Sequence, residues 1–218
     1  DVTTYVPALK MFDGIISTNL EASGTFNELS VKNFNIDYNN TSLKAKAVLK
    51  NILDTEKMNF DLQVTDSYID PSDPNKFLRD LDLPEYVEFG TVKIDTLTYF
   101  GGPLEFKTTF SIRTDKGKLN GFANLNMRSS DMVYEAALNT SNLDVGPFTS
   151  ISTDLNSQIN ISGVGFDPQK MKMNLEMEGV SSRFGEKYFN NINISSNAEN
   201  GLISTTLSLS SDSSTVDL

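Results

Sequence analysis

The stretch MKMNLEMEG, residues 171–179, alternates strictly between apolar and polar side chains. Successive side chains of an extended chain point to opposite faces. One face therefore carries Met171, Met173, Leu175 and Met177, while lysine, asparagine and glutamate fill the positions between them. This pattern predicts a β-strand with one apolar face, and the question is what that face contacts.

The same period of two recurs along almost the whole chain and predicts about twelve strands. The alternating runs lie at 16–22, 29–38, 43–49, 58–64, 92–99, 104–112, 123–127, 132–138, 159–161, 171–177, 192–194 and 207–209. Short polar or glycine-containing breaks such as YNNTS, TDKGK and NAENG separate them and are typical of hairpin turns. We therefore expect an antiparallel meander in which each strand has one apolar face.

Local departures from the alternation predict further elements. The apolar phase shifts between Val31 and Phe34, which predicts a β-bulge near Asn33. Asp73 and Pro74 suit the start of a helix, and apolar residues then follow at helical spacing, so a short helix is expected near 74–82. A second short helix is expected near 5–12, where Pro7 lies in the first turn.

These two helices are too small to cover a sheet of about twelve strands, and an apolar sheet face needs a cover. Three covers remain open: a second sheet, the same sheet curled on itself, or a partner that is not protein. The alternation alone favours the core of a closed β-sandwich.

The composition excludes several kinds of chemistry. The chain has no histidine and no cysteine, so it lacks the commonest general base, thiolate chemistry and the usual transition-metal ligands. No carboxylate pair stands out as catalytic, and Gly163 and Gly165 fit a bulge or tight bend better than a phosphate loop. We expect no enzyme activity, no cofactor and no metal site.

The charge balance also limits the partners. The chain of 218 residues carries a formal net charge of −11, which disfavours nucleic acid and charge-driven docking on an anionic membrane. No run of eighteen apolar residues is present, so no membrane-spanning helix is expected.

The order of several segments resembles the TamB family, in the wider AsmA-like group of envelope proteins, in its Bacteroidetes-type form. The resemblance covers nearly the whole chain. It rests on sparse structural motifs in a fixed order: YVPALKMFDG with LEASGTFNELSVKNFNIDY, then FLRDLDLPEYVEFG, YEAALNTSNLDVGPF and INISGVGFDPQK. The resemblance implies one continuous segment over residues 1–218, with approximate sub-units 1–70, 71–140 and 141–218.

The fold implied is all-β with one or two short helices: an elongated, strongly curved, mostly antiparallel sheet that forms an open apolar groove, the β-taco. The role implied is that of a periplasm-spanning, bridge-like lipid transfer protein that conducts phospholipids between inner and outer membranes. The expected location is the periplasm and cell envelope, with an inner-membrane anchor upstream of this interior piece. An outer-membrane barrel of the BamA/TamA type would meet parts that lie C-terminal to it.

The expected partner in the groove is the acyl chain of a phospholipid. The residues expected to line it are Phe106, Phe110, Ile112, Met132, Tyr134, Met171, Met173, Leu175, Met177, Ile192 and Ile194. Methionine is flexible and suits irregular or changing apolar partners.

Two other functions remain open. One is a scaffold or chaperone for the translocation and assembly of outer-membrane proteins, whose strand edges template a client strand. The other is a closed β-sandwich or binding module of a surface protein, in which the methionine face is an ordinary core.

Overall fold

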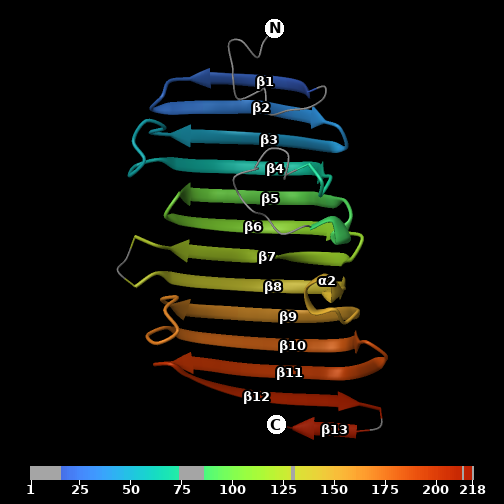
Figure 1. The fold of residues 1–218 in the computed structure, drawn as a ribbon. Helices are drawn as coiled ribbons and strands as arrows, with labels where there is room; N and C mark the ends of the chain where they lie inside the picture. The colour runs from blue at the N-terminus through green and yellow to red at the C-terminus, as the bar shows by residue number, and fades with distance from the viewer. Residues whose placement is uncertain (1–15, 74–85, 129–130, 213, 218) are drawn as a thin grey trace.

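A computed structural model describes residues 16–73, 86–128, 131–212 and 214–217. The helices expected near 5–12 and 74–82 lie outside these residues. The described chain is all-β: one antiparallel sheet in which each of the thirteen strands pairs with its neighbours in sequence (Figure 1). The strands are β1 Ile16–Gly24, β2 Glu28–Tyr38, β3 Thr41–Lys50, β4 Asn59–Ile69, β5 Val92–Gly102, β6 Glu105–Thr114, β7 Gly117–Asn126, β8 Val133–Leu143, β9 Thr153–Val164, β10 Lys172–Phe184, β11 Lys187–Glu199, β12 Leu202–Ser211 and β13 Ser214–Asp217.

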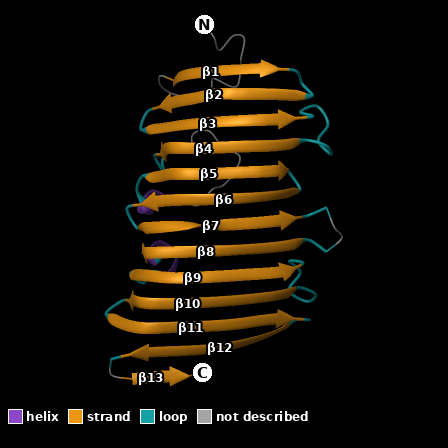
Figure 2. Cartoon of the chain, turned by 180° about the vertical axis from the view of Figure 1, so that it is seen from behind, coloured by secondary structure: helices purple, strands orange, loops and turns teal. Residues whose placement is uncertain are grey.

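The sheet is curled but does not close. The described strands form a single open row, with no second sheet against it (Figure 2). The expected all-β meander with hairpin connections is confirmed, and the closed-sandwich alternative is wrong. Two short helices accompany the sheet in the described chain: the 3-10 helix η3 at Tyr86–Phe89 and the α-helix α2 at Gly146–Thr149. Neither was expected from the sequence, because a single turn of helix leaves no apolar period to detect.

The molecule exposes far more surface than a globular protein of its mass. Its accessible surface is 14066 Å² at 24.1 kDa, whereas a compact monomer of that size exposes about 10,000 Å². Few large apolar side chains of the described chain are fully buried, among them Tyr38, Ile94, Leu155 and Ile192. The sheet is therefore held together mainly by its strand ladder and by contacts between neighbouring side chains on one face.

Register shifts interrupt the ladder in five strands. The shift in β2 falls between Val31 and Phe34, which confirms the bulge expected near Asn33. The others lie in β4, β5, β8 and β10, each within a few residues of the strand end that faces the loop containing α2. An extra residue in one strand bends that strand and increases its twist. Bulges gathered at one end of several strands thus give a physical account of the curl.

A buried hydroxyl accompanies three of these bulges and replaces a lost ladder bond. Ser67 in β4 accepts the Lys44 N–H at 2.8 Å, and Thr140 in β8 accepts the Ser157 N–H at 2.9 Å. Ser182 in β10 is fully buried and accepts the Asn156 N–H at 3.0 Å. A buried N–H without a partner destabilises the fold, so the hydroxyls of these small side chains lower the free-energy cost of the bulges.

Replacement of Ser182 by alanine tests this role. Ser182→Ala should lower the free energy of unfolding by about 1–3 kcal/mol, because the Asn156 N–H loses its buried acceptor. Ser195→Ala is the matched control: Ser195 lies exposed in β11, and its replacement should change stability by less than about 0.5 kcal/mol. Urea unfolding followed by circular dichroism measures both. Equal losses in the two variants would contradict the role of the hydroxyl.

Candidate functional site

The candidate site is the apolar face of the sheet, and the strand register defines it. Residues directly opposed in neighbouring antiparallel strands place their side chains on the same face. Following such pairs through Met177 gives one row across twelve strands, the Met177 row. It comprises Leu20, Phe34, Ala45, Val64, Leu97, Phe110, Gly121, Leu138, Ile159, Met177, Ile194 and Leu207. Every member is apolar or glycine.

Two parallel rows lie beside it on the same face, two residues apart along each strand except in β2, where the bulge separates Val31 from Phe34 by three. The Leu175 row comprises Ala22, Val31, Ala47, Leu62, Tyr99, Thr108, Ala123, Ala136, Ile161, Leu175, Ser196 and Thr205. The Met173 row comprises Gly24, Leu29, Leu49, Phe60, Gly101, Phe106, Leu125, Tyr134, Gly163, Met173, Ala198 and Ile203.

A shorter row completes the face on the side of the bulges. The Ile192 row comprises Ser67, Ile94, Ile112, Leu119, Thr140, Ser157, Gly179, Ile192 and Leu209. It is the best covered of the four rows, since Ile94 and Ile192 are 7% and 2% exposed. Side chains of the other rows from β2 to β11 are mostly half-buried, so they remain in part accessible from outside the sheet.

Nine of the eleven residues expected to line a groove lie in these rows. Met177, Phe110 and Ile194 belong to the Met177 row, Leu175 to the Leu175 row, and Ile112 and Ile192 to the Ile192 row. The Met173 row contains the remaining three, Met173, Phe106 and Tyr134. Met132 and Met171 instead lie just before β8 and β10, next to the same end of the face.

The eleven residues are not one compact cluster. They lie in or beside strands from β6 to β11, and the face continues without a break into β2–β5 through residues such as Leu62, Val64 and Leu97. The alternation had already marked these positions as apolar, but only the strand register shows that they belong to the same surface.

Several hydroxyl groups on this face form hydrogen bonds within the sheet. Thr108 donates to the Thr98 carbonyl at 2.7 Å, and Tyr99 donates to the Gly102 carbonyl at 2.7 Å. Ser196 and Thr205 hydrogen-bond each other at 3.0 Å. Among the described residues no buried side-chain polar atom lacks a partner. The face therefore presents mainly methyl, methylene and aromatic groups to a ligand.

An aromatic ring fills the place of a side chain at one glycine of the face. A Cβ at Gly163 would lie 2.3 Å from the Tyr134 hydroxyl, because the ring lies across this glycine and stacks on Phe166 at 4.8 Å. Gly163 is thus a regular strand residue, and its expected place in a bulge or tight bend is wrong. Gly165, with φ of 75°, does lie in the bend after β9.

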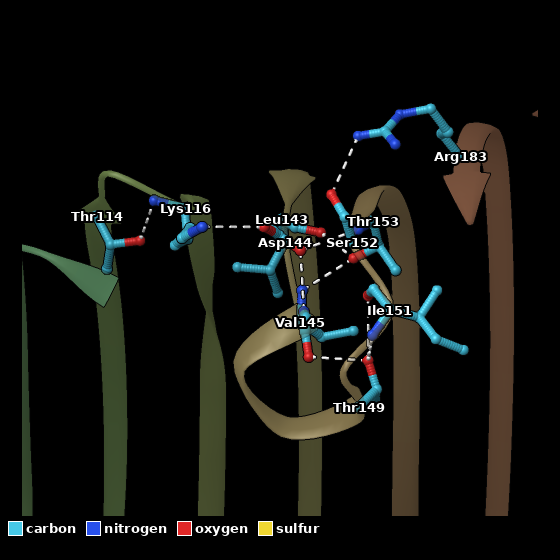
Figure 3. Close-up of polar contacts among 11 residues, drawn as sticks. Thr114, Lys116, Leu143, Asp144, Val145, Thr149, Ile151, Ser152, Thr153 and Arg183 are labelled. Carbon is cyan, nitrogen blue, oxygen red and sulfur yellow. Dashed lines mark hydrogen bonds and ion pairs between the residues drawn. The ribbon is translucent and has the colours of Figure 1, made fainter. Parts of the chain in front are cut away.

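The loop that contains α2 covers one end of the apolar face. Thr153 lies on this face, two residues before Leu155, and its Oγ1 accepts the Val145 N–H at 2.8 Å and donates to the Leu143 carbonyl at 2.9 Å (Figure 3). Phe148 of α2 contacts Phe89 of η3 at 5.1 Å between ring centroids. Figure 1 shows that α2 lies over the ends of β8 and β9 only, so the rest of those strands stays uncovered by it.

Asp144 is the centre of the polar contacts that hold this loop (Figure 3). Its Oδ1 accepts the N–H groups of Thr153 and Gly146, each at 2.9 Å, and its Oδ2 accepts Lys116 Nζ at 3.2 Å. The hydrogen bond from Thr153, followed by those from Gly146 and Lys116, lowers the pKa of Asp144 below its ordinary value of 3.8 despite partial burial.

Comparison with protein-family models, curated proteins and solved structures finds no match to this chain. The resemblance to the TamB family gains no support there and stays an expectation. No helix of the described residues is both long and apolar enough to pass through a bilayer. No group of three or more acidic, histidine or cysteine side chains in the described chain is placed to hold a metal ion.

The depressed pKa of Asp144 predicts an acid sensitivity. A carboxylate with a lowered folded-state pKa stabilises the fold above its unfolded-state pKa of about 3.9, and this contribution is lost as the pH falls through the folded-state pKa. The free energy of unfolding should therefore fall less steeply in Asp144→Asn than in the wild type as the pH drops below about 5. Urea titrations at stepped pH measure the slope, and identical slopes would exclude this role for Asp144.

Proposed function

We propose that this chain is a segment of a bridge-like lipid transfer protein whose apolar face lines a groove for phospholipid acyl chains. The observation that supports this proposal most is the continuity of the face. Four parallel rows extend across the sheet, and their side chains remain half-exposed because no second layer of the described chain packs on them.

The energetics favour an acyl chain as the occupant. Burial is worth about 0.8 kcal/mol per CH₂, so a sixteen-carbon chain gains roughly 12 kcal/mol on leaving water. A hydroxyl-rich ligand would find few partners, since the Thr108, Tyr99 and Ser196 hydroxyls are already engaged within the sheet. The lining is apolar from strand to strand, so a bound chain could slide along a row without breaking a specific polar contact.

The length of the sheet fits a segment of a longer conduit. Twelve spacings of about 4.8 Å between thirteen strands span about 58 Å. On the resemblance to the TamB family alone, we extend the proposal to a conduit in the periplasm, between an inner-membrane anchor and an outer-membrane barrel of the BamA/TamA type.

A charge placed on the apolar face should abolish lipid binding. Met173→Asp introduces a carboxylate in the Met173 row, where it would have to be desolvated beside an acyl chain. Asn174→Asp introduces the same charge one residue later, on the opposite and exposed face of β10. Mass spectrometry of co-purified lipid should find phospholipid on the wild type and on Asn174→Asp, and none on Met173→Asp.

Circular dichroism melting curves distinguish lost binding from lost folding. The half-buried position of Met173 leads us to expect that Met173→Asp keeps the β spectrum of the wild type. A wild type that carries no lipid, together with a Met173→Asp variant that unfolds, would make the face an ordinary structural core.

A second candidate function is a scaffold for client strands, and the exposure of β1 favours it. Eight of the nine residues of β1 are exposed, and no described strand pairs with its outer edge. An edge strand presents unpaired N–H and C=O groups that another strand can complete. A client β-peptide should then slow amide exchange in β1 and leave β7 unchanged. Unaltered exchange in β1 at saturating peptide would rule out this mode.

A further inference from the structure

Charged residues that face each other across the sheet follow a simple rule with one exception. Among the opposed pairs of the described strands, Glu28 faces Lys50, Asp154 faces Arg183, and Lys172 faces Glu199. The last pair forms an ion pair at 2.8 Å. The exception is a row of three cations, in which Lys93 faces Arg113 and Arg113 faces Lys118.

Such a row is unfavourable without a counter-charge. Opposed side chains have Cβ atoms about 4.5–5.5 Å apart, and like charges at that distance destabilise a sheet. The protein as a whole carries a net charge of −11, so three adjacent cations are not a by-product of a basic composition. A bound anion would reduce the repulsion among them.

The anions of the protein itself neutralise this row only in part. Asp95 accepts hydrogen bonds from Arg113 Nε at 2.9 and 3.0 Å and also contacts Nη2, which leaves the Nη1 group of Arg113 without a partner in the described chain. The pKa of Asp95 is lowered first by its hydrogen bond with Arg113 and further by the charges of Arg113 and Lys118. Lys93 and Lys118 are exposed, and neither makes an ion pair with a described residue.

The three cations border a hollow large enough for a small anionic group. Its volume is about 390 Å³. Besides the cations it is lined by the hydroxyl-bearing residues Thr91, Thr114 and Ser141. The carboxylate-bearing Asp115 also lines it, so the wall is cationic but not uniformly so.

The row also lies at the rim of the apolar face. Each cation is next in sequence to a member of the Ile192 row: Lys93 to Ile94, Arg113 to Ile112, and Lys118 to Leu119. The cations and these apolar residues therefore lie back to back on opposite faces, within two residues of the ends of β5, β6 and β7. A ligand with an apolar tail and an anionic head could reach the cations and the half-buried Ile112 and Leu119 by passing around this end of the strands.

We propose that Lys93, Arg113 and Lys118 form a binding site for a phosphate group. Lysine binds phosphate as a point charge, and the free Nη1 group of Arg113 adds a donor. The source of the phosphate that we infer is a phospholipid head group whose acyl chains lie on the apolar face, and this part rests on the proposed function. A free phosphate compound would use the same cations, so the experiment separates the two sources.

The site itself is tested with a ligand that has no acyl chain. Glycerol 3-phosphate is titrated at low ionic strength, where charge screening is weak, and binding is followed by NMR shifts of the backbone amides of β5, β6 and β7, which every variant retains. The double variant Lys93→Gln/Lys118→Gln should bind it about tenfold more weakly than the wild type. Lys44→Gln/Lys46→Gln is the control, because it removes the same charge from exposed lysines of the same face in β3.

Equal weakening in the two double variants would show a general charge effect and overturn the site. All four substitutions are at exposed positions and none removes an ion pair between described residues, so no variant should melt below the wild type, and a lower melting temperature identifies a variant that fails to fold.

The source of the phosphate is tested by adding acyl chains to the same head group. If a lipid is the ligand, dihexanoyl phosphatidic acid should bind the wild type more tightly than glycerol 3-phosphate. Equal affinities would keep the phosphate site but overturn its assignment to a lipid. Binding of an uncharged alkyl alcohol should be the same in the wild type and in Lys93→Gln/Lys118→Gln. Its absence in both would overturn the proposed function and leave the phosphate site standing.

Discussion

The strand register is the constraint on which the rest of this structure depends. A slip of one residue between two strands would move every apolar side chain of one strand to the other face. The Met177 row shows that this does not happen anywhere from β1 to β12, even though five strands contain bulges. Each bulge therefore leaves the apolar side chains before it and after it on the same face of the sheet.

The bulges and their buried hydroxyls explain how the sheet can bend and still keep its faces apart. In β10 the chain turns through Ser181, with φ of 46°, and the next side chain, Ser182, satisfies the N–H of Asn156. Asp66 and Ser67 repeat the arrangement in β4, where the hydroxyl takes the N–H of Lys44. The same small residues that permit the curl thus keep the polar atoms at this end of the sheet hydrogen-bonded within it. A curled, open sheet with one apolar face is the form that a continuous acyl-chain groove would require.

Much of the fold could be predicted from the sequence, because a period of two is a local signal. The alternation places the strands, and a phase shift between Val31 and Phe34 reveals one bulge. The bulge at Ser181 escaped detection, since its strand turns polar there and has no apolar phase to shift. The role of Gly163 could not be predicted for a different reason, because the ring that lies across it belongs to Tyr134, on a neighbouring strand.

The candidate sites also combine features that are local in the sequence with features that arise only from strand pairing. Individual apolar positions such as Met173 could be named from the sequence, but the extent of the face depends on how twelve strands align. The cation row could not be recognised from the sequence, because Lys93, Arg113 and Lys118 become neighbours only through the pairing of β5, β6 and β7. Its significance also depends on charged pairs elsewhere in the sheet being complementary.

Photolabelling tests most directly whether acyl chains lie along the apolar face. A phospholipid with a diazirine in its acyl chain is bound and irradiated, and adducts are mapped by mass spectrometry. Acyl chains on this face should give adducts at alternate residues of β10, on Met173, Leu175 and Met177, and leave Asn174 and Glu176 unlabelled. Adducts without this alternation, or on the polar residues of β10, would contradict this position of the acyl chains.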